Sequence, residues 1–228
     1  MNISGIFMAI FDLFPVVLFL VGGIYYQRML YNKMSKGAFA LFSAGTIFTF
    51  VAGIFKATYK ILLESGACDF TILNKCFFPM QTIGFVLAAA GLVAMLSYPQ
   101  GKHAAYSFIP LPILAFPFLN ETVKEFDGTM IFVVLMVLGV LVMDAALGYI
   151  AIKTKNYFII IFIAISFVFT LGMGYLSTKP DLSDWIKEIV NTVGQALFMT
   201  SAIIFKKKGL EDINSLNPVS YTHLRAHE

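Results

Sequence analysis

The sequence predicts an all-α membrane protein with seven transmembrane helices, and three observations support this prediction. Of the 228 residues, 59% are hydrophobic and only 13% are charged, whereas about a quarter of the residues in a soluble domain are charged. Seven apolar runs approach or exceed the roughly 20 residues with which a helix crosses a bilayer. The connections between them are short, so residues 1–208 are predicted to form one membrane domain, followed by a cytoplasmic tail over 209–218.

Each predicted helix corresponds to one apolar run. In chain order, the helices are expected over residues 5–26, 37–63, 77–96, 104–119, 130–152, 157–176 and 183–205. The fourth run gives the weakest signal, because it is short and contains three prolines, each of which removes a backbone hydrogen bond from a helix. The seventh run starts with Asp184, Lys187 and Glu188 and becomes apolar only afterwards.

The distribution of basic residues predicts the orientation of the chain. If the N-terminus lies outside, the inner connections and the end of the last helix contain nine basic residues and the outer connections contain five. The inner set is Arg28, Lys33, Lys36, Lys102, Lys153, Lys155, Lys206, Lys207 and Lys208, and the outer set is Lys60, Lys75, Lys124, Lys179 and Lys187. Basic residues favour the cytoplasmic side, so we expect a cell-membrane protein with its N-terminus outside and its C-terminus inside. No Lys or Arg precedes the first run, which argues against a cleaved signal peptide.

Two ionisable residues lie at similar depth inside the first two predicted helices. Asp12 is about seven residues into the first helix, and Lys56 is about seven residues before the outer end of the second. Because a charge in the hydrocarbon core is costly, we expect Asp12 and Lys56 to form an ion pair. Lys60 is close enough to the outer surface to extend into water, and it is expected to need no partner.

Other polar and kinked positions are predicted at the same depth as this pair. Pro15 frees a backbone carbonyl beside Asp12, and Pro79 has the same effect in the third helix. Three polar side chains complete the predicted cluster: Gln81, Thr170 and Asn191. Two interpretations stay open. The charges fix the packing of the helices, or the cluster binds a solute or an ion, as bent helices with free carbonyls do in many transporters.

A third ionisable residue, Asp144, lies in the inner half of the fifth predicted helix with no cation nearby on that helix. Apolar surroundings favour the protonated form of a carboxyl group. Its expected neighbours from helices two and seven are Ser43, Thr46, Gln195, Thr200 and Ser201. Asp144 and Gln195 therefore form a candidate proton or cation site, and the alternative is a neutral acid that hydrogen-bonds across helices.

Both cysteines of the chain, Cys68 and Cys76, fall in the connection between the second and third predicted helices. The orientation places this connection outside, where an oxidising environment permits a disulfide. The alternative is two reduced, small apolar residues near the membrane surface.

Several function classes lack the residues that they require. The three histidines all lie outside the apolar runs, so no metal site is predicted in the membrane. No HExxH, GxSxG, P-loop or GxGD motif occurs, and no catalytic residue or cofactor is predicted. The formal net charge of +3 is small and its basic residues are scattered, which argues against nucleic acid as a partner.

Short similarities in the same order suggest an internal duplication. Residues 48–53 resemble 167–172, and residues 82–84 resemble 192–194. Helices one to three would then repeat as helices five to seven in the same membrane direction, with the fourth helix as a linker. This 3+1+3 arrangement is similar to SWEET and PQ-loop carriers. Their Pro-Gln signature belongs within a helix, however, whereas Pro99-Gln100 follows the third predicted helix.

The helix count and the outer N-terminus also resemble the layout of microbial rhodopsins. That resemblance implies a retinal-linked lysine midway along the last helix. The only candidate, Lys187, lies at the outer mouth of that helix. No retinal is therefore expected.

The last ten residues, 219–228, resemble a translated sequencing adapter. The resemblance implies an environmental or draft assembly in which the reading frame continued into the adapter, and a bacterial source is expected. The natural C-terminus beyond Pro218 is then undefined, and His223, Arg225 and His227 carry no functional argument.

Three functions are compatible with these features. The first is a transporter of a small solute or ion, with Asp12, Lys56 and Gln81 lining an outer pocket and Asp144 exchanging protons or cations. The second is a seven-helix sensor with a cytoplasmic signalling partner or a lost output domain. The third is a lipid enzyme embedded in the bilayer, which ranks last because no nucleophile or metal set accompanies either carboxyl group.

Overall fold

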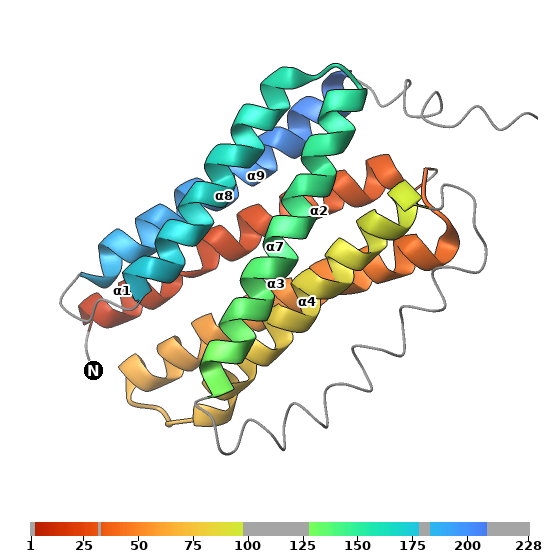
Figure 1. Ribbon diagram of the computed structural model, residues 1–228. Helices are drawn as coiled ribbons and strands as arrows, with labels where there is room; N and C mark the ends of the chain where they lie inside the picture. Colours follow the sequence, from red (N-terminus) through yellow and green to blue (C-terminus); the bar gives the residue numbers. More distant parts are fainter. Residues whose placement is uncertain (1–2, 32, 98–127, 178–182, 209–228) are drawn as a thin grey trace, which may run out of the picture.

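The computed structural model describes residues 3–31, 33–97, 128–177 and 183–208. The helix predicted over 104–119 lies outside the described residues. The described chain forms helices in the order α1 (Ile3–Phe11), α2 (Leu13–Leu30), α3 (Lys36–Ser65), α4 (Thr71–Ser97), α7 (Gly128–Lys153), α8 (Tyr157–Ser177) and α9 (Asp184–Lys208) (Figure 1).

Six helical stretches of the described chain are long and apolar enough to cross a membrane. They correspond to the six predicted helices that fall within the described residues, and α1 and α2 together form the first of them, Ser4–Leu30. The largest difference from the predicted bounds is at α4, which begins six residues before the expected position 77. The prediction of an all-helical fold is therefore confirmed for this part of the chain, and its long helices are compatible with a membrane protein.

Local sequence explains where these helices begin, break and end. The regular α-helix is interrupted at Asp12, three residues before Pro15, which has no N–H to donate to the carbonyl of Phe11. The side chain of Ser35 accepts a hydrogen bond from the backbone of Ala38 and caps the start of α3. Gly66 ends α3 in the left-handed conformation, with φ of 73°, which glycine adopts at little cost.

The described helices form a ring in chain order. Each helix packs against the next, α4 packs against α7, and α9 closes the ring against α2. The half-helix α1 packs on α3. In Figure 1 the long helices run along a common direction, so the ring has two distinct ends.

Contacts between α4 and α7 show that these two helices run in the same direction. The hydroxyl of Thr82 donates to the carbonyl of Phe132 over 2.8 Å, and Gly139 lies against Phe85 further along both helices. The end of α4 and the start of α7 therefore lie at opposite ends of the bundle (Figure 1).

We name the two ends by their charges. The acidic end is where α1, α4, α7 and α9 begin, and it carries Glu64, Asp69 and Asp184. The basic end is where α2, α4, α7 and α9 end, and its described basic residues are Arg28, Lys33, Lys36, Lys153, Lys155, Lys206 and Lys207.

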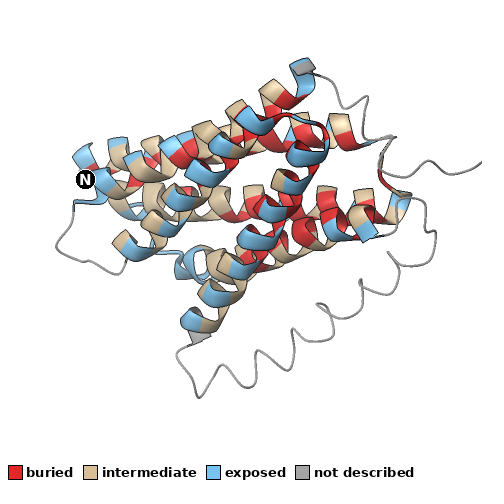
Figure 2. Ribbon diagram, turned by 45° about the horizontal axis from the view of Figure 1, so that its top comes forward, coloured by how far each residue is buried: buried red, intermediate tan, exposed pale blue. Residues whose placement is uncertain are grey.

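The core of the bundle lies toward the basic end, and Figure 2 shows the buried residues concentrated in that half. Small residues bring α3 and α4 close together there. A Cβ atom added to Gly91 would lie 2.7 Å from the backbone of both Ala38 and Phe42, so only glycine permits this approach. The acidic half is less tightly filled, and it contains the candidate site.

Candidate functional site

A cavity of about 70 Å³ opens among α2, α3, α4 and α9 near the acidic end. Since a buried water needs roughly 10–15 Å³ of such space, the cavity can hold several waters or one small solute. The charged and amide side chains that line it are Asp12, Lys56, Gln81, Glu188, Asn191 and Gln195. The remaining lining is largely apolar and includes Phe50, Phe77 and Phe85.

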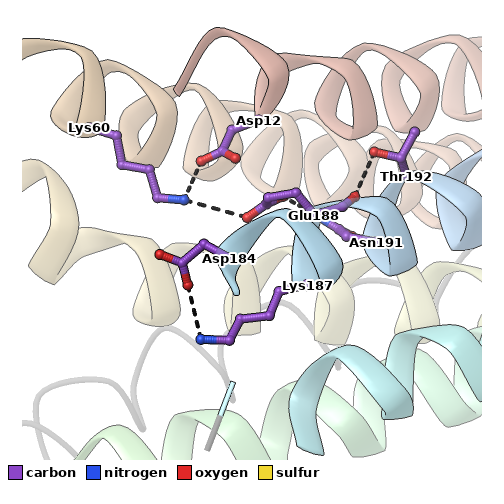
Figure 3. A network of polar contacts seen from close by, with 7 residues as sticks. All are labelled: Asp12, Lys60, Asp184, Lys187, Glu188, Asn191 and Thr192. Atoms are coloured by element: carbon purple, nitrogen blue, oxygen red, sulfur yellow. Dashed lines mark hydrogen bonds and ion pairs between the residues drawn. The ribbon is translucent and has the colours of Figure 1, made fainter. Parts of the chain in front are cut away.

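Two of the lining residues, Asp12 and Glu188, belong to an ion-pair network centred on Lys60 (Figure 3). The Lys60 ammonium pairs with Oδ2 of Asp12 and lies 3.4 Å from Oε1 of Glu188. Both carboxylate side chains are only 5% exposed. Two buried carboxylates thus share one ammonium group, and its removal would leave both without their ion-pair partner.

The predicted pairing of Asp12 with Lys56 is wrong, because the partner of Asp12 is a different lysine. Asp12 bonds to Lys60, the residue that was expected to extend into water and need no partner. The physical reason is the direction of helical side chains, which lean toward the N-terminus of their helix. Because α3 runs toward the acidic end, the side chain of Lys60 leans into the bundle and reaches the depth of Asp12.

The same lean carries Lys56 deeper, into the cavity itself. Its Nζ lies 4.6 Å from the centre of the Phe77 ring on α4, which is a cation–π contact. Within the described residues, Lys56 makes no ion pair or hydrogen bond. Oδ1 of Asp12 likewise has no hydrogen-bond partner among them. The cavity therefore presents one cationic and one anionic group that are not fully engaged.

The polar face of α9 supplies the opposite part of the network. Glu188, Asn191, Thr192 and Gln195 follow the i, i+3, i+4, i+7 spacing of one helical face. The amide nitrogen of Asn191 lies 3.5 Å from Oε2 of Glu188, and the hydroxyl of Thr192 donates to the Glu188 carbonyl over 2.7 Å. The prediction did not include Glu188, although this periodic polar stripe could have identified it.

Of the three polar side chains that were predicted beside Asp12 and Lys56, two line the cavity and one does not. Gln81 and Asn191 are in its wall. Thr170 on α8 is not part of the lining, and its hydroxyl donates to the carbonyl of Ser166 one turn earlier. Gln195, which the sequence grouped with Asp144, lines this cavity.

An aromatic layer closes the cavity toward the basic end. Phe19 and Phe85 line the cavity, with ring centres 5.9 Å apart. Phe19 also stacks on Phe198 of α9 at 5.5 Å and 15°, and Phe198 in turn contacts Tyr26 at 5.2 Å. All four rings are buried. These phenylalanines could not be singled out from the sequence, because 24 Phe are distributed along the chain.

A second set of buried polar groups lies beyond this layer, in the basic half. The hydroxyls of Tyr26 and Ser201 are 2.7 Å apart, and the amide of Gln27 donates to the hydroxyl of Thr46. Asp144 on α7 is 8% exposed and lies within electrostatic range of Tyr26. Among the described residues it forms no hydrogen bond or ion pair.

Cys68 and Cys76 are both free thiols, the first exposed in the connection before α4 and the second partly buried on α4. Across the described ranges, no group of three or more His, Cys, Asp or Glu side chains is arranged to hold a metal ion. The charged and amide side chains that line the cavity can bind charged and hydrogen-bonding groups.

Comparison with known proteins adds no identity to this geometry. No family model, no curated protein and no solved structure matches the chain. The function has to be inferred from the cavity and from its position in the bundle.

Proposed function

We propose that the protein is a multi-pass transporter of the cell membrane that moves a small polar solute or an ion through the cavity between α2, α3, α4 and α9. The observation that carries this proposal is a charged cavity within helices long enough to cross a bilayer. Ionisable groups are kept at such depth where they serve a substrate or ion pathway. The cavity is large enough for a solute but not for a retinoid or a sugar chain.

The aromatic layer and the second polar group support alternating access as the mechanism. In this state the substrate reaches the cavity from the acidic end, and Phe19, Phe85 and Phe198 block its further passage. The Tyr26–Ser201 pair and Asp144 then provide polar groups on the far side of the block. Transport would require the rings to separate after the acidic end has closed, as helices rock against each other around a fixed site.

The protein is further proposed to cross the membrane seven times, with the acidic end outside. The parallel direction of α4 and α7 supports this count, since the chain between them has to return from one end of the bundle to the other. A crossing over 104–119, as predicted, would satisfy that requirement. The clustering of basic residues at one end supports the orientation, because such residues favour the cytoplasm.

Labelling of single cysteines tests this topology. In a variant whose two native cysteines are replaced by serine, Met130→Cys is expected to react with an impermeant maleimide in intact cells, and Ser97→Cys only after the membrane is permeabilised. The same side for both positions would reject the seventh crossing. Labelling of Ser97→Cys alone in intact cells would keep the crossing and reverse the orientation.

Uptake into proteoliposomes tests the transport function. A panel of labelled small amines, carboxylates, amino acids and inorganic ions should contain at least one that accumulates saturably above protein-free vesicles. Replacement of Lys56 by methionine should reduce that uptake roughly tenfold or more, because a charged contact to a ligand contributes about 1.5–3 kcal/mol. Lys187→Met is the matched control, since Lys187 is not part of the cavity lining and, among the described residues, pairs with the exposed Asp184.

Two results of this assay would change the proposal. If every solute stays at the level of empty vesicles, transport is rejected. If uptake depends on a proton gradient and is unchanged by Asp144→Asn, Asp144 has no part in proton coupling and serves packing alone.

A further inference from the structure

We propose that the cavity binds a small zwitterion, a solute the size of glycine that carries a carboxylate and an ammonium group. This inference rests on the proposed transport function and names its substrate class. It follows from the groups in the cavity that lack partners, from the balance of charge and from the space available.

The cavity groups that are not fully paired indicate which charged groups the solute carries. Among the described residues, Lys56 makes a direct contact with the face of Phe77 and no ion pair or hydrogen bond, so its ammonium can pair with a carboxylate. Oδ1 of Asp12, on a side chain that is 5% exposed, has no hydrogen-bond partner among the described residues, so it can accept an ammonium N–H. A solute with both groups would satisfy both residues at once, and buried polar groups are normally satisfied.

The balance of charge disfavours simpler ions. Two basic residues, Lys56 and Lys60, stand opposite two acidic residues, Asp12 and Glu188, so their formal charges sum to zero. A lone anion or cation would add a net charge to a site with little water, which is costly. A zwitterion adds none, and its two ends align with the existing charges.

The positions of the helices order these charges across the cavity. Lys56 leans toward α4, where Gln81 also lines the wall. Asp12 and Glu188 lie on the side of α1 and α9, held by Lys60. The carboxylate of the solute is therefore placed toward α4, and its ammonium toward α9. Phe50 and Phe77 leave an apolar surface for a short aliphatic group.

Uptake of four probes of similar size tests the substrate class. Full-length protein in proteoliposomes is given labelled glycine, acetate, methylammonium or glycolamide, which differ in charge but little in volume. Glycine uptake is expected to exceed that of each other probe by roughly 10- to 100-fold, the range for one lost charged contact. Lys56→Met should lower glycine uptake by a similar factor, and Lys56→Arg should restore part of it.

Equilibrium binding separates a failure of this inference from a failure of transport. Trp185, the only tryptophan in the chain, contacts Phe11 beside Asp12 at 5.6 Å, so its fluorescence should respond when glycine occupies the cavity. Saturable glycine binding that Lys56→Met abolishes, together with no uptake of any probe, would keep the zwitterion site and reject transport.

Other outcomes overturn the inference directly. If acetate, methylammonium or glycolamide enters as fast as glycine, the transporter stands and the zwitterion class is wrong. If glycine neither binds nor enters the vesicles while another probe enters them, the zwitterion class is likewise wrong. The thermal unfolding of each variant is measured as well. If Lys56→Met is unstable, Lys56→Arg, which retains the positive charge, is used for the test instead.

Discussion

Lys60→Met is expected to lower the free energy of unfolding by about 3–5 kcal/mol, which is the cost of breaking a buried ion pair by removing one partner. The substitution would leave Asp12 and Glu188, both 5% exposed, without the ammonium that they share. Unfolding in mixed micelles with increasing denaturing detergent, followed by Trp185 fluorescence, measures the change.

The control is Lys187→Met, in the exposed Asp184–Lys187 pair at the start of α9, where a loss of only about 0.5 kcal/mol or less is expected. A double-mutant cycle then identifies the partner of Asp12. Lys60→Met and Asp12→Asn should couple by about 1 kcal/mol or more, and Lys56→Met and Asp12→Asn should couple by less. Additive losses for Lys60 and Asp12 would show that the pair contributes nothing to stability.

Phe19→Ala is expected to open the aromatic layer and produce a leak. Phe19 contacts both Phe85 and Phe198 and is buried, so its removal would connect the cavity to the polar groups around Tyr26 and Asp144. Because each 1.4 kcal/mol of barrier is a factor of ten in rate, we expect a roughly tenfold or greater rise in downhill flux of the transported solute. The loss of a buried ring should also cost about 3–5 kcal/mol of stability.

Phe14→Ala is the control for the loss of any aromatic ring from this helix, because Phe14 lies on the same helix as Phe19 but is 56% exposed. It should change stability by about 0.5 kcal/mol or less and leave the flux unchanged. Flux through proteoliposomes with an outward solute gradient is the measurement. A Phe19→Ala protein that is folded and shows no leak would remove the aromatic layer from the transport mechanism.

The class of fold was predictable because it depends on local hydropathy. The runs later found as α3, α7, α8 and α9 were placed within a few residues, since each is a continuous apolar stretch with charged flanks. The break at Asp12 was also predictable, because Pro15 removes one specific hydrogen bond whatever the helix packs against.

The site was predictable only in part. Depth along each helix follows from residue counting at about 1.5 Å per residue, and this placed Asp12, Lys56, Gln81 and Asn191 at one level. Gln195 was assigned to the wrong group, and Thr170 to a cavity that it does not line. Depth does not determine which face of a helix points inward. The assignments of Gln195 and Thr170 failed because that rotation was unknown.

The sequence by itself determined the all-helical fold, the approximate positions of the described apolar helices and the level of the polar cluster, because these depend on composition and on rise per residue. Only the tertiary structure decided that Lys60 binds Asp12, that Glu188 is buried beside it, and that Phe19, Phe85 and Phe198 meet beneath the cavity. Such contacts join residues far apart in the chain, and they depend on the rotation of each helix and on the lean of its side chains toward the N-terminus.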